Sequence, residues 1–129
     1  MPAKIIVKPA AAPPAVGPYS HAVRQGDLLF CSGQIPLDPA TGQIVPGDIR
    51  AQTARVLENV RVLLDSQGLS FAHVLKTTVF MTNLEDFAAM NEVYAQFFTE
   101  DYPARSTVQV AALPRGAQVE IEIVAHCGS

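Results

Sequence analysis

One long amphipathic segment, residues 48–67, constrains the fold of this chain more than any other part of its sequence. Its apolar side chains recur with the ~3.6-residue period of an α-helix, and most of its charged side chains fall on the opposite side. Asp48 can cap the first turn, and Gly68 can adopt the left-handed conformation that ends a helix. Such a helix buries one face against another layer of structure, so the rest of the sequence must supply that layer.

The rest of the sequence predicts a sheet and one further helix. Five segments predict strands: 22–24, 28–32, 74–81, 105–111 and 118–125. The first two flank a short glycine-containing connection, which is typical of a β-hairpin. The second helix begins after Asn83, whose side chain can cap it, and must end before Pro103. This order of elements predicts an α/β fold with at least one parallel βαβ unit.

Two helices can cover only one face of such a sheet, so the other face must contact water, a partner or a ligand. In the penultimate strand, Val108 points one way while Arg105 and Thr107 point the other. In the last strand, apolar residues alternate with Glu120 and Glu122. We therefore expect each strand to turn its apolar side toward the helices and its Arg- or Glu-bearing side toward the uncovered face.

The composition bounds what the chain can be. Its 129 residues suit a single domain spanning residues 1–129, with 49% apolar and 16% charged side chains. Soluble domains usually carry about 25% charged residues, so part of the apolar surface is expected to be hidden against another copy of the chain. The formal charge of −3 is unfavourable for a non-specific nucleic-acid binder. No apolar stretch could span a membrane and no signal-peptide core is present, so we expect a soluble, cytoplasmic protein.

Most standard catalytic arrangements are missing from the sequence. Its histidines are scattered without the spacing of a metal site, and Cys31 and Cys127 do not complete one, so no metal is expected. Ser20 and His21 are adjacent in an extended segment, so their side chains diverge and cannot form a nucleophile–base pair. The sequence also lacks a glycine-rich phosphate-binding loop.

Arg105 and Glu120 remain as candidate functional residues. Arg105 follows Pro103 at the start of a strand, where its guanidinium could grip a carboxylate through two parallel hydrogen bonds. Glu120 could orient or deprotonate a water molecule if its surroundings raised its pKa. The pattern alone leaves open a simpler interpretation, in which both side chains are solvated or form an interface salt bridge.

Four separated motifs occur in an order that is typical of one protein family. They are Gly17-Pro18-Tyr19-Ser20, Ser32-Gly33-Gln34-Ile35-Pro36 with Thr41-Gly42, Pro103-Ala104-Arg105-Ser106, and Val119-Glu120-Ile121-Glu122. The chain resembles the YjgF/Rid family over essentially its whole length. Within that family it is most similar to the RidA branch, the 2-iminobutanoate/2-iminopropanoate deaminases.

The resemblance implies a specific architecture. It implies an α+β domain like that of a bacterial chorismate mutase, with a mixed sheet, two helices on one face, and the last strand inserted between earlier ones. It also implies a homotrimer in which three sheets pack around a central barrel, with a ligand cleft at each interface. The face that the helices leave uncovered would then form the trimer interior and the pocket wall.

The resemblance also implies roles for individual residues. Arg105 matches the arginine that holds the substrate carboxylate, and Glu120 matches the glutamate that positions the attacking water. The remaining matched residues wall the cleft or approach the ligand: Tyr19, Ser32, Gly33 and Asn91. One departure follows the arginine, where the family usually has Ser-Cys-Val-Glu-Val and this chain has Thr107 in place of the cysteine. A thiol role is therefore excluded there, whereas a role for the Thr107 backbone is not.

The implied reaction is hydrolysis of a short 2-imino acid, or its enamine tautomer, to a 2-keto acid and ammonia. The substrate would be a small carboxylate-bearing imino acid released by pyridoxal-phosphate enzymes, and the protein itself would need no cofactor. Two alternatives stay open: an endoribonuclease or translation inhibitor, and a non-catalytic module that binds a carboxylate metabolite. No nucleic-acid or membrane partner is expected.

Overall fold

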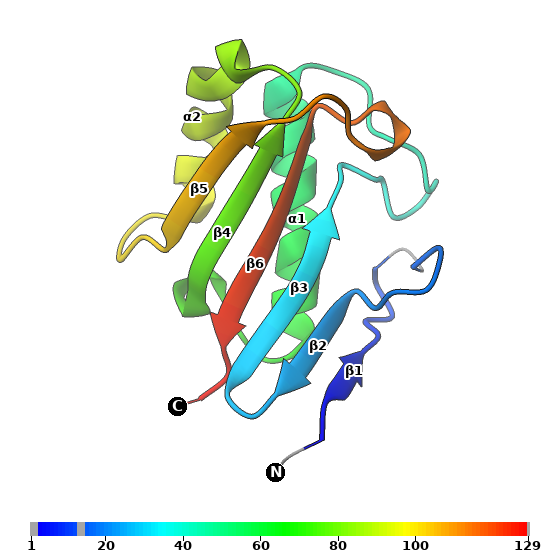
Figure 1. Ribbon diagram of the computed structural model, residues 1–129, viewed down its shortest axis with the longest axis vertical. Helices are drawn as coiled ribbons and strands as arrows, with labels where there is room; N and C mark the ends of the chain where they lie inside the picture. The colour runs from blue at the N-terminus through cyan, green and yellow to red at the C-terminus, as the bar shows by residue number, and fades with distance from the viewer. Residues whose placement is uncertain (1–2, 13–14, 129) are drawn as a thin grey trace.

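The computed structural model describes residues 3–12 and 15–128, and it consists of one mixed sheet with two helices packed on one face (Figure 1). The six strands lie in the order β1-β2-β3-β6-β4-β5. Their bounds are Ile5–Val7 (β1), Ala22–Gln25 (β2), Leu28–Gln34 (β3), Val74–Met81 (β4), Ala104–Gln109 (β5) and Val119–His126 (β6). The helices are Ile49–Ser66 (α1) and Phe87–Phe97 (α2). The predicted mixed sheet with two helices on one face is confirmed.

Helix α1 forms where the sequence predicts it. The Asp48 carboxylate accepts a hydrogen bond from the Ala51 backbone N–H at 3.1 Å, which caps the first turn. Gly68, with φ of +69°, follows the last turn in the left-handed region. The apolar stripe of the helix is fully buried against the sheet: Val56, Leu57, Val60, Leu63 and Leu64. Burial of such side chains stabilises the fold by about 1.5–3 kcal/mol each.

Strand β6 lies at the centre of the sheet although it is the last strand in the chain. It pairs antiparallel with both β3 and β4, so it is inserted between elements that precede it by many residues. β4 and β5 are parallel and are joined through α2, which confirms the predicted βαβ unit. The short edge strand β1 is not among the predicted strands. It has only three residues and Pro9 follows closely, so its sequence is too short to show the alternating pattern of a strand.

The two sides of β5 are reversed relative to the prediction. Arg105 is paired with Thr77 of β4, and the Thr77 hydroxyl hydrogen bonds with the Tyr94 hydroxyl of α2 at 2.8 Å. Arg105 and Thr107 therefore lie on the helix-covered side, and Val108 lies on the uncovered face. The expectation that the apolar side of β5 faces the helices is wrong. β5 is an edge strand beside the short helix α2, so its side chains depend less on burial than those of a central strand.

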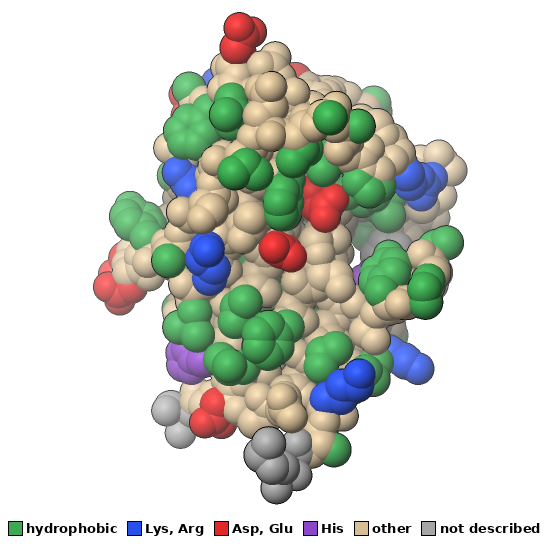
Figure 2. All heavy atoms as spheres, viewed as in Figure 1, with side chains coloured by type: hydrophobic (Ala, Val, Ile, Leu, Met, Phe, Trp, Pro, Cys, Tyr) green, Lys and Arg blue, Asp and Glu red, His purple; other side chains and the backbone are tan. Residues whose placement is uncertain are grey.

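The prediction for β6 is confirmed, since its apolar residues are buried and Glu120 and Glu122 lie on the uncovered face. Figure 2 shows this face, where apolar side chains surround acidic ones near the centre. Phe30 and Val108 lie there with 46% and 42% of their surface exposed. No helix in the described part of the chain is long and apolar enough to cross a membrane.

Candidate active site

A cavity of about 490 Å³ opens where the end of β3, the start of β6 and the segment leading into β2 meet. Four of the residues that the sequence analysis predicts for the site line it together: Tyr19, Ser32, Gly33 and Glu120. We call it the Glu120 pocket. Its volume suits a small metabolite.

The Glu120 carboxylate lies directly over the Gly33 backbone. A Cβ atom placed at position 33 would be 1.9 Å from Oε2 of Glu120 and 2.7 Å from its carboxyl carbon, and both separations are shorter than non-bonded Cβ contacts allow. The register between β3 and β6 shifts between Cys31 and Gln34, so this approach occurs at an irregularity in the sheet. A side chain at position 33 would therefore displace the flexible end of Glu120, so glycine leaves the space that the carboxylate occupies.

The negative charge of the Glu120 carboxylate is poorly stabilised by its surroundings. Partial burial raises the pKa of its carboxyl group, and the nearby carboxylate of Glu122 raises it further. Among the described residues, none forms a hydrogen bond or ion pair with the Glu120 side chain that would favour its charged form. A half-buried carboxylate of this kind is suited to orient a water molecule and to exchange a proton with it.

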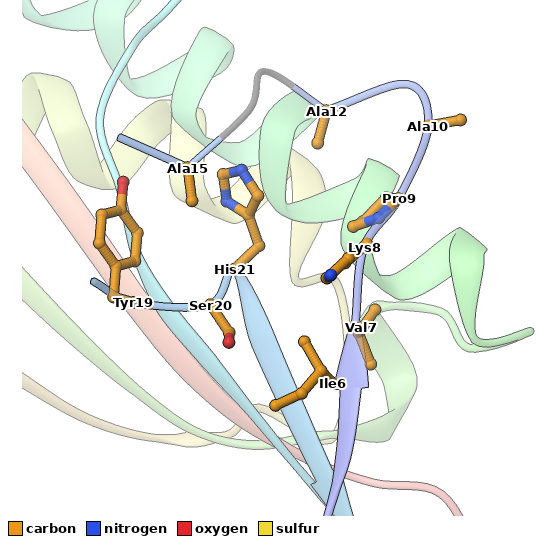
Figure 3. Close-up of a pocket in the computed structure, with 10 residues that line it drawn as sticks. All are labelled: Ile6, Val7, Lys8, Pro9, Ala10, Ala12, Ala15, Tyr19, Ser20 and His21. Atoms are coloured by element: carbon orange, nitrogen blue, oxygen red, sulfur yellow. The ribbon is translucent and has the colours of Figure 1, made fainter. Parts of the chain in front are cut away.

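The segment that leads into β2 is fastened to β3 by Ser32. The Ser32 hydroxyl donates to the Ser20 carbonyl at 2.6 Å, and the Ser32 backbone N–H donates to the His21 carbonyl at 2.8 Å. The rings of Tyr19 and His21 stand on the same side of the chain in an edge-on contact, 6.3 Å between centroids, and the Ser20 side chain points the other way (Figure 3). The predicted divergence of Ser20 and His21 is confirmed.

Arg105 lines a second cavity, of about 480 Å³, which we call the Arg105 pocket. Its guanidinium donates a hydrogen bond to the Asn91 side-chain oxygen at 2.7 Å. The guanidinium carbon also lies 4.7 Å from the centroid of the Tyr94 ring and 5.4 Å from that of Phe87. These contacts fix the plane of the guanidinium, whose other N–H groups can bind a carboxylate in a forked arrangement.

Tyr94, whose ring supports Arg105, keeps its hydroxyl group protonated. Burial raises the pKa of its hydroxyl, and this effect exceeds the opposing effects of the Thr77 hydrogen bond and of Arg105. Thr107 lies two residues beyond Arg105 and lines neither pocket. Its hydroxyl oxygen is buried and finds no hydrogen-bond partner in the described part of the chain.

Arg105 and Glu120 do not converge within the chain. Glu120 is paired with Phe80 on the uncovered face, whereas Arg105 is paired with Thr77 on the helix-covered face. Strand β4 also separates their strands, so the two backbones are about 10 Å apart across the sheet. Of the predicted residues, the structure thus places Tyr19, Ser32, Gly33 and Glu120 in one pocket, and Arg105 and Asn91 in the other.

Several residues that line the Glu120 pocket have no predicted site role, and two of them, Asn59 and Arg115, carry polar side chains that bear on its function. Asn59 is a buried residue of α1 whose amide donates to the carbonyls of Ile35 and Leu37 at 3.3 and 2.9 Å, which fixes the loop that walls the pocket. The signal that could have found it is a polar residue within the apolar stripe of a helix. Arg115 lines the pocket from the turn before β6. Among the described residues, no cluster of His, Cys, Asp or Glu could hold a metal ion.

The structure is thus a small α+β domain with two cavities of about 490 and 480 Å³ at its sheet. The profile of the Endoribonuclease L-PSP family matches residues 9–127, and the chain belongs to this family. This family is the one that the sequence analysis calls YjgF/Rid, so the predicted resemblance is confirmed.

Named relatives agree with this assignment. The chain is 56% identical to protein DfrA of Myxococcus xanthus over 116 residues, which cover 88% of each chain. It is 45% identical over 123 residues to the 2-iminobutanoate/2-iminopropanoate deaminase of Capra hircus, covering 95% of this chain and 90% of the goat protein. The crystal structure of E. coli TdcF with bound serine superposes with a TM-score of 0.90 at 48% identity, covering 95% of this chain and 98% of TdcF.

Proposed function

We propose that this protein hydrolyses short 2-imino acids, or their enamine tautomers, to 2-keto acids and ammonia. The observation that carries the proposal is the Glu120 carboxylate, which lies unpaired among the described residues over Gly33 in a metabolite-sized cavity, with its pKa raised. The goat relative supports it, since its name states this activity. TdcF supports it too, because serine carries the α-carboxylate that a 2-imino acid also carries.

The working form is a homotrimer with the chorismate-mutase-like arrangement, in which three sheets surround a central barrel. Two observations support this assembly. The uncovered sheet face exposes apolar side chains such as Phe30 and Val108, which a partner would bury. Arg105 and Glu120 also lie on opposite faces of one sheet, so a ligand that contacts both must take Arg105 from a neighbouring subunit.

In the proposed mechanism, Arg105 of one subunit holds the substrate carboxylate through two parallel hydrogen bonds, and Asn91 keeps the guanidinium oriented. Glu120 of the next subunit orients a water molecule and accepts its proton as the water oxygen attacks the carbon of the protonated imine. The resulting carbinolamine takes that proton back on nitrogen. Glu120 then accepts the proton of the remaining hydroxyl group as the C–N bond breaks, so that the hydroxyl becomes the ketone carbonyl and ammonia leaves. Tyr19, Ser32 and Gly33 wall the cleft.

The test is an assay in which an amino-acid oxidase releases 2-iminobutanoate in the cuvette and 2-ketobutanoate formation is followed. We expect the purified protein to accelerate ketone formation well above spontaneous hydrolysis, and Glu120→Ala and Arg105→Ala each to lose the effect. Glu100→Gln is the matched control, because it removes an exposed carboxylate that lines neither pocket. Absence of acceleration by the wild-type protein would overturn the proposal.

The family description favours a second candidate, cleavage of RNA. The same preparation is therefore incubated with single-stranded RNA. The proposal predicts that any cleavage persists in Arg105→Ala and disappears on further purification, since Glu120 and Glu122 on the uncovered face repel phosphates. Cleavage that copurifies with the protein and is lost in Arg105→Ala would support the ribonuclease. Saturable binding of 2-ketobutanoate without imine turnover would support a binding module.

A further inference from the structure

Arg115 lies in the turn Pro114–Gly116 that leads into β6, and its exposed side chain lines the Glu120 pocket. Of the described residues that line this pocket, no other is a lysine or an arginine. The described part of the chain also provides the Arg115 guanidinium with no hydrogen bond or ion pair. The pocket therefore has an unpaired cation at its rim as well as the unpaired carboxylate of Glu120.

The backbone at Arg115 is strained. Its φ of 58° and ψ of 24° place a residue with a long side chain in the left-handed region, and Gly116 follows with φ of 72°. A residue other than glycine, asparagine or aspartate in this conformation costs about 1–2 kcal/mol. Asparagine or glycine would remove most of this cost, so the strain is compatible with a function for the side chain.

The walls of the pocket indicate what that function is. On the proposed function, the α-carboxylate of the substrate is bound by Arg105 of the neighbouring subunit and its imine carbon faces Glu120. The substrate side chain must then contact the remaining walls. These walls comprise apolar residues, polar residues and one cation: Val16, Ile35, Leu37 and Pro114; His21, Gln34 and Asn59; and Arg115. The apolar walls suit a short aliphatic chain, whereas Arg115 can bind an anionic group at the end of a longer one.

We propose that Arg115 is a specificity-determining residue that extends the substrate range to 2-imino acids with a second carboxylate at the end of the side chain. This inference rests on the proposed deaminase function. It adds a substrate class, the four- and five-carbon dicarboxylic imino acids, and a second cation that recognises it.

The test compares 2-iminobutanoate with the imines of aspartate and glutamate, each released in situ by an amino-acid oxidase. Arg115→Asn removes the charge but tolerates the left-handed backbone, so the fold is retained, and Arg115→Lys keeps the charge. We expect Arg115→Asn to lower kcat/KM for the dicarboxylic imines at least fivefold, through KM, and to change that for 2-iminobutanoate less than twofold. Arg115→Lys should retain most of the dicarboxylic activity.

Arg61→Gln serves as the control for lost charge, because Arg61 binds Glu58 and stands over Phe71, outside both pockets. If the wild-type protein accelerates hydrolysis of 2-iminobutanoate but not of the dicarboxylic imines, this inference is overturned while the proposed function stands. Equal losses on both substrates in Arg115→Asn, or no loss on either, also overturn it. Failure of the wild-type protein on every imine would overturn the proposed function itself.

Discussion

The Glu120 pocket and the Arg105 pocket present opposite charges in opposite ways. The carboxylate of Glu120 is half-buried and lacks a hydrogen-bonding partner in the described part of the chain, and its pKa is raised. The guanidinium of Arg105 is held by Asn91 and by the rings of Tyr94 and Phe87. An unsatisfied acid can exchange protons, whereas an oriented cation binds an anion in one geometry. On the proposed function, this difference assigns the reaction to the first pocket and the binding of the substrate carboxylate to the second.

The largest expected effect tests whether the two pockets act together across a subunit interface. Arg105→Ala and Glu120→Ala should each lower kcat/KM at least about 100-fold, because one loses a charged clamp and the other a general base. The two variants are then co-expressed with different tags, and trimers are purified through both tags. In each mixed trimer, only one interface joins a subunit with an intact Arg105 to a next subunit with an intact Glu120. One site of three is therefore complete, and activity should return to about one third of wild type.

Two controls make this complementation decisive. The double variant Arg105→Ala/Glu120→Ala, co-expressed with the wild-type chain in the same way, measures the activity of trimers that contain damaged subunits. Each variant alone, passed through the same purification, measures the residual activity. Mixed trimers as inactive as the single variants would contradict a shared site and would leave the two pockets functionally separate.

A second prediction sharpens the assignment of the reactive pocket. Gly33→Ala places a methyl group where Oε2 of Glu120 lies, so the carboxylate must move while the strand remains. We expect kcat to fall about 10- to 100-fold with native circular dichroism, since a misplaced catalytic group costs that much. In the Glu120→Ala background the same substitution should have no further effect on activity. Full activity in Gly33→Ala would show that the position of this carboxylate does not matter.

A third prediction addresses how the binding pocket is organised. Asn91→Ala removes the oxygen that accepts the 2.7 Å hydrogen bond from Arg105, so the guanidinium loses part of its orientation. We expect KM for 2-iminobutanoate to rise about 3- to 10-fold with kcat nearly unchanged, the effect of roughly 1 kcal/mol in binding. Gln96→Ala on the exposed side of α2 is the matched control. A loss confined to kcat would contradict a role in binding.

The sequence predicts the parts of the fold that burial dictates. The bounds of α1 and β4 follow from apolar periodicity and β-branched runs, because those side chains fill the core. The side of β5 that faces the helices is not predictable in this way. It is an edge strand, and the Arg105 stem and guanidinium pack on aromatic rings of α2 as an apolar residue would.

The site divides in the same manner. Tyr19, Ser32, Gly33 and Glu120 are linked in the sequence by the family motifs, and the structure places them around one pocket. The separation of Arg105 from Glu120 depends on strand order and register, which arise from long-range pairing and not from local pattern. Arg115 escaped prediction because an exposed arginine in a turn has no sequence pattern that distinguishes it from a solvated one.

The smallest predicted effect is thermodynamic and bears on the charge state of the reactive pocket. Glu120 titrates higher in the folded chain than its ordinary value of about 4.3, so the folded state binds its proton more tightly. The free energy of unfolding of the wild-type protein therefore falls as pH rises from the ordinary pKa of glutamate to the raised pKa of Glu120, and it stays lowered above that range. Glu120→Gln lacks this penalty, so it should melt about 1–3 °C higher at pH 7, a small shift because solvent screens a half-exposed carboxylate. The difference should vanish below about pH 4, where the carboxyl is protonated in both states.

Melting is compared at equal protein concentration, since assembly also affects it. A Glu120→Gln variant that melts lower at pH 7 would mean that Arg105 of the neighbouring subunit pairs with Glu120 directly in the empty site.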